Sequence, residues 1–150
     1  MKYPDSKKIN YRIPASEDLQ VIINLLKECH LPVSDIEPDK QSFIVAEYEG
    51  KMIGCAGMEI YGETALFRSL AVRLNYRNLK TGKELTGKVM ELGGKNGIHE
   101  LYLLTTTADG FFQQLGWKVT DRNNVPPAIT GSLEFASICP STAICMSYTL

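Results

Sequence analysis

A strand, a basic turn, a helix and a second strand follow one another between residues 65 and 107, and this order constrains the fold more than any other feature of the chain. The apolar segment ALFRSLAV ends in the turn RLNYRNLK. A helical pattern starts at Thr81 and runs to about Leu92, where GGKNG is expected to break it. ELYLLTT then reads as a central strand buried on both faces. Two strands joined through a helix in this way lie parallel, with a right-handed crossover.

The segments upstream of this unit predict one helix and an antiparallel meander. ASEDLQVIINLLKECHLP is typical of an amphipathic helix, with Ser16 as the expected N-cap and Pro32 as the stop. SFIVAEYEGKMIGCAGMEIYGETALFRSLAV reads as three strands joined by turns at EGK and YGE. Gly54 and Gly57 indicate a bulge or a close backbone approach in the middle strand.

The segments downstream predict a short helix in ADGFFQQLG, with Gly116 suited to its C-terminal cap. WKVT and AICMSYTL read as strands, and Pro127 suits a first helical turn. The element order is therefore β-α-β-β-β-α-β-α-β-β. We expect an α/β (α+β) fold with a mixed, mostly antiparallel sheet flanked by helices, and one domain over residues 1–150.

Composition excludes several classes of function. The net charge of −1 over 150 residues gives no overall attraction to nucleic acid or to anionic lipid. No apolar run reaches the ~18 residues of a membrane span, and MKYPDSKKIN lacks a signal-peptide core. We therefore expect a cytoplasmic protein without nucleic-acid or membrane partners. Four cysteines without paired spacing and two histidines predict buried reduced thiols and no metal site.

The turn before the second helix has the character of an anion site. A phosphate at a helix N-terminus meets free backbone N–H groups and the positive end of the helix dipole. Arg77, Lys80 and Lys83 place cationic side chains around that end. The alternative is a solvated basic loop.

This junction resembles the pyrophosphate motif of the GNAT superfamily of acyl-CoA-dependent N-acetyltransferases. That motif is Arg or Gln, two residues, Gly, one residue, then Gly or Ala. RNLKTG supplies Arg77 and Gly82 at its outer positions, and Lys80 replaces the inner glycine. ADGFFQQLGW resembles a second GNAT pattern, with Ala108 matching and Phe112 where a tyrosine usually protonates the departing CoA thiolate.

Further segments resemble one GNAT subgroup, the small acetyltransferases named for arsenic-resistance operons. They are LPVSDIEP, FIVAEYEGKMIGCAGMEIYG, LFRSLAV, LYLLTTTADGFFQQLGW, DRNNVPPAI and EFASICPSTAICM. Members of this subgroup usually carry YRGxGxG at the turn, so Asn78 and Lys80 are departures. Because φ angles at a helix start need no glycine, we expect the turn to tolerate Lys80 and its ammonium to assist binding.

The resemblance implies a CoA site between two splayed parallel strands. Backbone of Leu70, Ala71 and Val72 would pair with pantetheine, and the amide at Leu70 would polarise the thioester carbonyl. The amides from Asn78 to Lys83 would cradle the pyrophosphate. The expected cofactor-binding residues are Leu70, Ala71, Val72, Arg77, Asn78, Leu79, Lys80, Thr81, Gly82, Lys83, Thr105, Ala108 and Phe112.

Three side chains are candidates for handling the acceptor. Arg68 would either clamp a substrate anion or form a structural ion pair with Glu59 on the neighbouring strand. Glu59 is the candidate to accept the amine proton, directly or through water, and its alternative is an exposed turn glutamate. Arg122 is a weaker candidate for the acceptor site.

Threonines Thr105, Thr106 and Thr107 end the fifth expected strand at the splay. Thr106 is a candidate for contacting the acceptor. Equally, hydroxyls at this point would cap the following helix.

The leading hypothesis is an acetyl-CoA-dependent N-acetyltransferase that acts on the primary amine of a small, amino-acid-like substrate. The subgroup resemblance alone suggests arsinothricin, an arsenic-containing glutamate analogue. The alternatives are an acyl-CoA-binding module with little turnover and a protein N-acetyltransferase. Acetyl-CoA and a small amine are the expected partners, no metal is expected, and a homodimer stays open.

Overall fold

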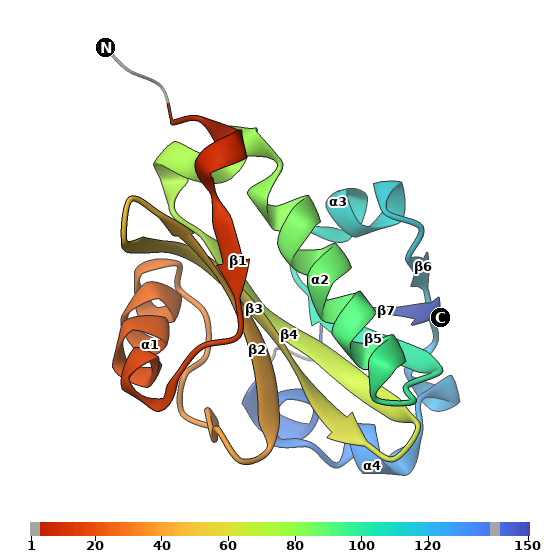
Figure 1. Ribbon diagram of the computed structural model, residues 1–150. Coiled ribbons are helices and arrows are strands. Elements are labelled where there is room, and N and C mark those ends of the chain that lie inside the picture. Colours follow the sequence, from red (N-terminus) through yellow and green to blue (C-terminus); the bar gives the residue numbers. More distant parts are fainter. Residues whose placement is uncertain (1–3, 139–141) are drawn as a thin grey trace.

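The computed structural model describes residues 4–138 and 142–150, and its framework is a seven-stranded sheet in the order β1-β2-β3-β4-β5-β7-β6 (Figure 1). The strands are β1 Asn10–Arg12, β2 Gln41–Tyr48, β3 Lys51–Tyr61, β4 Thr64–Val72, β5 Glu100–Thr105, β6 Lys118–Val119 and β7 Ile144–Thr149. The α-helices are α1 Leu19–Glu28, α2 Thr81–Lys95, α3 Asp109–Gln114 and α4 Pro127–Thr130. Shorter 3-10 turns and a π-helical turn at Glu134–Ile138 connect them. The predicted fold class is confirmed, and the predicted order differs only by the short helix α4 between β6 and β7.

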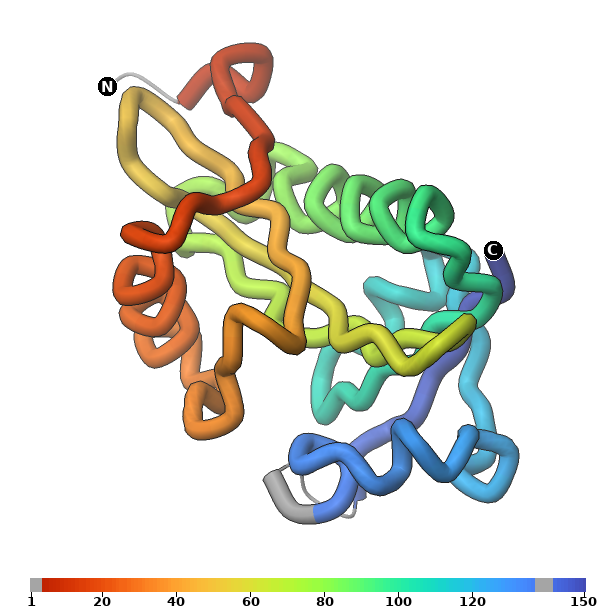
Figure 2. The backbone as a smooth tube through the Cα atoms, turned by 60° about the horizontal axis from the view of Figure 1, so that its bottom comes forward, coloured from red at the N-terminus to blue at the C-terminus, as the bar shows by residue number. Residues whose placement is uncertain are grey.

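The two long helices cover opposite faces of the sheet, as Figure 2 shows. The apolar face of α1 packs on Phe43, Val45 and Cys55, whereas α2 packs on the alternate residues of the same strands, Ile44 and Ala56 among them. This alternation follows from the two-residue side-chain period of a strand, and it explains why β2 and β3 are apolar along almost their whole length. A smaller cluster beneath α4 buries Leu66 of β4 and Tyr102 of β5.

The helix ends differ in two ways from the sequence expectation. Ser16 is not the N-cap of the first helix: a 3-10 turn precedes α1, and the Asp18 carboxylate accepts a hydrogen bond from the Ala15 backbone N–H over 2.7 Å. The second helix ends inside GGKNG, as expected, but it continues beyond Leu92 to Lys95. Gly93 is buried, and a Cβ there would make ordinary van der Waals contacts with Met58 and Ile98, so packing does not require a glycine at this position.

A bulge is present between β3 and β4, but its extra residue belongs to β4 and not to the middle strand β3, where a bulge or a close backbone approach was expected. Cys55 pairs with Ala71 and Gly57 pairs with Arg68, so two residues of β4, Ser69 and Leu70, oppose Ala56 alone. Ser69 has a φ of 60°, which is unusual for a residue other than glycine. Bulges redirect a strand, and this one lies where β4 leaves its parallel neighbour.

The parallel pair β4–β5 is hydrogen-bonded at only three positions, from Thr64 opposite Glu100 to Leu66 opposite Tyr102. Beyond them β4 continues to Val72, while β5 continues to Thr105 and pairs along its whole length with β7. The two strands therefore separate after Leu66 and Tyr102, in agreement with the expectation of two splayed parallel strands.

Candidate active site

A cavity of about 1050 Å³ occupies the gap between the parted strands. The second half of β4 forms one wall, and the end of β5 with α3 forms the other. The loop after α1, from Cys29 to Pro32, closes one side, and Glu134 and Ala143 close another. Because a large, well-formed pocket is the first candidate for a ligand site in any structure, this cavity is the candidate binding site.

The wall formed by β4 contains the three backbone positions predicted to pair with a pantetheine arm. Leu70, Ala71 and Val72 all line the cavity, next to Ser69. Ser69 adopts a left-handed backbone conformation, and such strain concentrates at functional sites. The bulge at Ser69 and Leu70 therefore gives β4 an irregular edge where it faces the cavity.

The N-terminal end of α2 closes the cavity at the end of β4. Arg77, Asn78, Lys80, Gly82 and Lys83 line this end. The Arg77 Nε donates to the Val72 carbonyl over 2.8 Å, which holds the side chain across the end of the strand. The first amides of a helix lack intrahelical acceptors, so this end offers N–H groups and cations together.

Two residues of the predicted cradle lie behind the turn. Leu79 packs against the main core, and Thr81 is fully buried with its hydroxyl donating to the Tyr76 carbonyl over 3.1 Å. Neither is among the residues that line the cavity. Their side chains stabilise the turn.

The backbone at Lys80 contradicts one expectation. Lys80 has φ 60° and ψ 20°, so it occupies the left-handed region rather than a helix-start conformation. The turn therefore requires the conformation that the usual glycine adopts readily, and the lysine adopts it at a steric cost. Its side chain is exposed at the mouth of the cavity.

The opposite wall contains Thr105, Thr106, Thr107, Ala108 and Phe112. The Thr105 hydroxyl accepts a hydrogen bond from the Ala108 N–H over 2.9 Å, which holds the turn that leads into α3. Ala108 is the N-cap of α3, and no side chain caps the helix there.

The Phe112 ring lies within a group of aromatic side chains. It meets Phe67 and Trp117 edge-on with ring centroids 5.7 Å apart, and Phe111 at 5.0 Å. Only 5% of Phe112 is exposed, although the residue lines the cavity. Its role in the described structure is to build the wall by packing.

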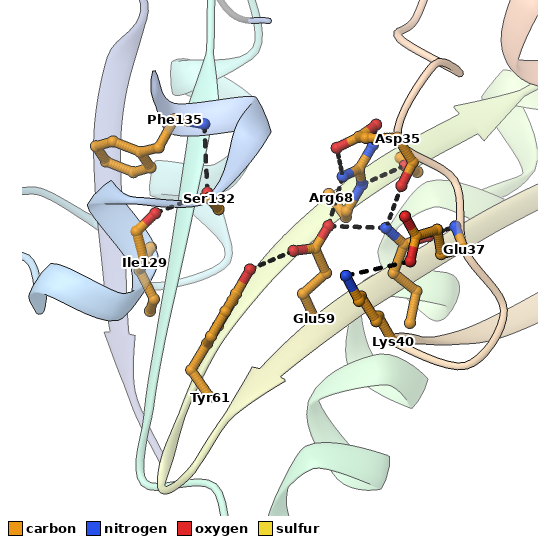
Figure 3. Close-up of polar contacts among 11 residues, drawn as sticks. Asp35, Glu37, Lys40, Glu59, Tyr61, Arg68, Ile129, Ser132 and Phe135 are labelled. Carbon is orange, nitrogen blue, oxygen red and sulfur yellow. Dashed lines mark hydrogen bonds and ion pairs between the residues drawn. The ribbon is translucent and has the colours of Figure 1, made fainter. Parts of the chain in front are cut away.

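Arg68 lies in a buried polar cluster that the sequence predicted only in part (Figure 3). Its side chain is fully buried and forms ion pairs with Asp35 and Glu59, the latter over 2.7 Å. Nη2 also donates to Asp35 over 2.7 Å, and Nε donates to the Ser69 hydroxyl over 3.0 Å. The ion pair with Glu59 was one of the two predicted alternatives, and Asp35 was not expected.

The charge state of Arg68 follows from these neighbours. Burial lowers the pKa of Arg68, but the hydrogen bond to Asp35 and the negative charges of Glu134, Asp35 and Glu59 outweigh it and raise the pKa. Arg68 therefore stays protonated at any physiological pH. The ion pairs attach the loop between α1 and β2, which holds Asp35, to the sheet.

Glu59 lies behind Arg68 and is not among the residues that line the cavity. Its Oε1 accepts hydrogen bonds from Gln41 over 2.8 Å and from Arg68, and its Oε2 accepts one from the Tyr61 hydroxyl. Burial and this bond to Glu59 raise the pKa of Tyr61. A proton-accepting role for Glu59 stays a prediction, and it would need a connecting water.

Arg122 lies outside the lining of the cavity. Its Nη2 donates to the Ala143 carbonyl over 2.7 Å, and its guanidinium lies 5.4 Å from the centre of the Phe135 ring. These contacts attach the short 3-10 turn at Arg122–Asn124 to the segment before β7. Its predicted role at the acceptor site stays a prediction.

Three residues at or behind the cavity were not identified from the sequence. Asp35 comes from a loop without periodicity, Ser69 gave no sign of its backbone conformation, and Glu134 belongs to the π-helical turn. Glu134 is only 6% exposed and lines the cavity. A glutamate within the apolar run SLEFASI was the one available signal, because buried carboxylates are rare.

The described residues contain no group of three or more metal-ligating side chains, and none of their helices is long and apolar enough to cross a membrane. Cys29, Cys55 and Cys145 are free thiols, while Cys139 lies outside the described residues. Burial raises the pKa of Cys55 to about 12. Cys55 is therefore an inert core thiol at physiological pH.

Comparisons with known proteins agree with this geometry. The model of the acetyltransferase (GNAT) domain family matches residues 39–119. An uncharacterized N-acetyltransferase of Chlorobaculum tepidum is 32% identical over 114 residues, which cover 75% of this chain and 71% of that protein. An amino-acid acetyltransferase of Aeromonas salmonicida is 30% identical over 93 residues, but these span only 21% of its length.

Solved structures share the fold at low sequence identity. N-acetylglutamate synthase from Neisseria gonorrhoeae, solved with coenzyme A and L-arginine, has a TM-score of 0.79 and 18% identity. That match covers 95% of this chain and 33% of the synthase. A Mycobacterium tuberculosis protein solved with CoA has a TM-score of 0.79 at 17% identity, over 94% of this chain and 99% of that one.

Proposed function

Because the chain belongs to the GNAT family of acetyltransferases, with acetyl-CoA as cosubstrate, we propose that it transfers the acetyl group to the primary amine of a small molecule. The observation that carries this proposal is the cavity between β4 and β5, which runs from the basic start of α2 to the buried side chain of Arg68. We also propose that residues 1–150 act as one acetyltransferase domain.

The donor would lie along β4. The pyrophosphate would bind at the start of α2, where Arg77, Lys80 and Lys83 surround the first helical amides. The pantetheine arm would follow Val72 and Ala71 toward Leu70. A pantetheine arm on this path would bring the thioester toward the bulge at Ser69 and Leu70.

Transfer requires an unprotonated amine beside the thioester. The nitrogen lone pair attacks the carbonyl carbon, a C–N bond forms, and the C–S bond breaks to release CoA as its thiolate. The Leu70 backbone N–H would stabilise the oxyanion that develops on the carbonyl oxygen. The amine proton would pass to Glu59 through water or directly to solvent, and Phe112 offers no proton to the thiolate.

Amino-acid-like acceptors are the class that the relatives suggest, since one matched relative is an amino-acid acetyltransferase and a structural neighbour is N-acetylglutamate synthase. Each is matched over a third of its length or less. Arsinothricin is the most specific acceptor that we propose within this class, and only the resemblance to the arsenic-resistance subgroup supports it. Thr106 and Arg122 are proposed as secondary acceptor contacts.

The test combines calorimetry with acetyl-CoA and a thiol-release assay over a panel of amines, amino acids, arsinothricin and peptides. Product mass must show N-acetylation, because hydrolysis also releases thiol. Turnover of small amines supports the proposal. Turnover of peptides alone would assign the chain to the protein acetyltransferases, and binding without amine turnover would contradict the proposal.

A further inference from the structure

Strained backbone is concentrated at the cavity. Among the described residues other than glycine, His30, Glu49, Ser69 and Lys80 have a positive φ. All of them except Glu49, which lies in the turn between β2 and β3, line the cavity. Such conformations cost free energy and persist only where the surrounding contacts impose them. Ser69 is the member of this group that lies within a strand, so its contacts need a physical account.

Ser69 reverses the side-chain alternation of β4. Phe67 packs in the main core beneath α2, and so do Leu70 and Val72, whereas Ala71 packs beneath α1. Phe67 and Leu70 therefore share a face although they are three positions apart, where a regular strand places every second residue on one face. Backbone N–H groups alternate between the two edges of a strand in the same way. The extra residue therefore also changes which N–H groups face the gap between β4 and β5.

Two hydrogen bonds hold Ser69 in this conformation. Its hydroxyl accepts a hydrogen bond from Arg68 Nε over 3.0 Å, and its carbonyl accepts one from the Cys55 thiol over 3.4 Å. Arg68 is itself held by its ion pairs with Asp35 and Glu59 (Figure 3). The buried polar cluster therefore connects directly to the bulge, and the Ser69 hydroxyl is the connecting group.

The remaining bonds of Arg68 agree with a role in holding its neighbours. A guanidinium has five N–H donors. Nη1 donates to Asp35 and to Glu59, Nη2 donates to Asp35, and Nε donates to Ser69. A single N–H of Nη2 is left over from these bonds, so the side chain has no pair of parallel donors to offer a substrate carboxylate.

We propose that Ser69 is a positioning residue for acetyl transfer: the hydrogen bond from Arg68 to its hydroxyl fixes the left-handed bulge that directs the Leu70 N–H toward the thioester carbonyl. The inference rests on the proposed function, in which this N–H stabilises the developing oxyanion, and it names the contact that orients the N–H. Ser69 acts through Leu70 and not on the reacting atoms. Because an oxyanion donor acts mainly in the transition state, its orientation affects kcat more than substrate binding.

The first experiment compares Ser69→Ala and Ser69→Gly with wild type, using the best acceptor from the amine panel. Both substitutions remove the hydroxyl, but only glycine adopts a positive φ without strain. Each variant should lower kcat roughly 10-fold or more, a part of the 10²–10³-fold loss that follows removal of one oxyanion donor. The KM of the amine and the Kd of acetyl-CoA should stay within about 2-fold of wild type, since the lost interaction belongs to the transition state.

Urea unfolding separates positioning from a merely structural role. Ser69→Gly should unfold at a higher urea concentration than Ser69→Ala, because the strain is relieved, yet its kcat should be just as low. If Ser69 only stabilised the fold, the glycine variant would instead recover the activity. Glu49→Gly is the matched control, because Glu49 also has a positive φ but is exposed and does not line the cavity. This control should keep the wild-type kcat.

The second experiment observes the carbonyl itself, in the infrared spectrum of bound acetyl-CoA with an isotope-labelled acetyl group. A hydrogen bond to a carbonyl oxygen weakens the C=O bond and lowers its stretching frequency. The frequency should therefore be higher in both Ser69 variants than in wild type and in Glu49→Gly. This measurement needs no amine and no turnover.

The outcomes separate the inference from the function beneath it. A wild-type kcat in either folded Ser69 variant would overturn the inference while the proposed function stands. An unchanged carbonyl frequency in both variants would do the same. No turnover of any amine by wild-type protein, with acetyl-CoA bound, would overturn the proposed function and this inference with it. If Ser69→Ala fails to fold, Ser69→Gly decides by kcat and by the infrared spectrum.

Discussion

At the proposed phosphate site before α2, Lys80 combines two opposing effects. Its ammonium is exposed at the mouth of the cavity, where one charge contributes roughly 1 kcal/mol in a wet site. Its backbone has φ 60°, which costs a non-glycine residue about 1 kcal/mol. The first effect acts on binding and the second acts on folding.

Substitution by glycine and by alanine separates these effects. Lys80→Ala and Lys80→Gly should both weaken acetyl-CoA binding several-fold, more so at low ionic strength, because both remove the ammonium. Lys80→Gly should be the more stable of the two by about 1 kcal/mol, because glycine adopts positive φ without strain. Calorimetry at two salt concentrations and urea unfolding measure the two quantities. Tighter binding by Lys80→Gly than by wild type would mean that the lysine obstructs the ligand.

At Phe112, the addition of a single hydroxyl group tests whether turnover depends on protonation of the leaving thiolate. Phe112→Tyr adds a hydroxyl to a ring that lines the cavity and packs edge-on against Phe67 and Trp117. A thiolate leaves readily without a proton, so kcat should change by less than the ~100-fold effect of a positioned general acid. The assay is steady-state thiol release, with Phe112→Leu as the packing control. A gain beyond that limit would show that wild-type turnover is limited by protonation of the leaving group.

At the scale of elements, the close contact of β2 with β3 depends on Gly57. A Cβ at this position would lie 2.8 Å from the Phe43 ring and 3.1 Å from the Ser42 carbonyl oxygen. Gly57 pairs with Arg68 beside the bulge of β4, so displacement here also moves the polar cluster. β3 therefore has no space for a side chain at Gly57, directly opposite Arg68 of the polar cluster.

Gly57→Ala should destabilise the chain by about 1–3 kcal/mol, the usual cost of overpacking. Gly94→Ala is the matched control, because Gly94 lies in α2 and a methyl group added there would have no neighbouring atom within 4 Å. The control should stabilise the helix by up to ~1 kcal/mol. Urea denaturation of both variants gives the comparison. Equal stability of the two would contradict the packing argument.

Helices and strands were predictable because their periodicity reflects burial, whereas the cluster around Arg68 was only half predictable. The alternation of β4 placed Arg68 on a buried face, and the adjacent strand supplied Glu59. Asp35 lies 33 residues from Arg68 in a loop, and no periodic pattern links the two. Strain at Ser69 left no sign in the sequence, because its φ is set by the surrounding strands. At Lys80 the glycine usual in the GNAT motif was the available signal.

At the scale of the whole molecule, the order of strand, helix and strand was enough to predict the parallel pair and its flanking helices, because handedness and short connections leave few alternatives. The position of the turn proposed to bind CoA followed from the resemblance to the GNAT motif. The proposed acceptor end could not be predicted in the same way. It is assembled from the loop after α1, β4 and the π-helical turn, which meet only in the folded chain.

The short contact between β4 and β5 also has a mechanical consequence. Three paired positions join a half-sheet of β1–β4 to a half-sheet of β5, β7 and β6, and this seam is much shorter than the pairing of β3 with β4 on one side or of β5 with β7 on the other. A cosubstrate lying in the gap would bridge both halves and add about 2.7 kcal/mol against their separation at a hundredfold excess over Kd. Amide hydrogen exchange should therefore slow on both sides of the seam when acetyl-CoA binds, and uniform slowing across β2 and β3 would argue against it. The acyl donor would then connect β4 and β5 where they are not paired with each other, and each catalytic cycle would remove and restore this connection.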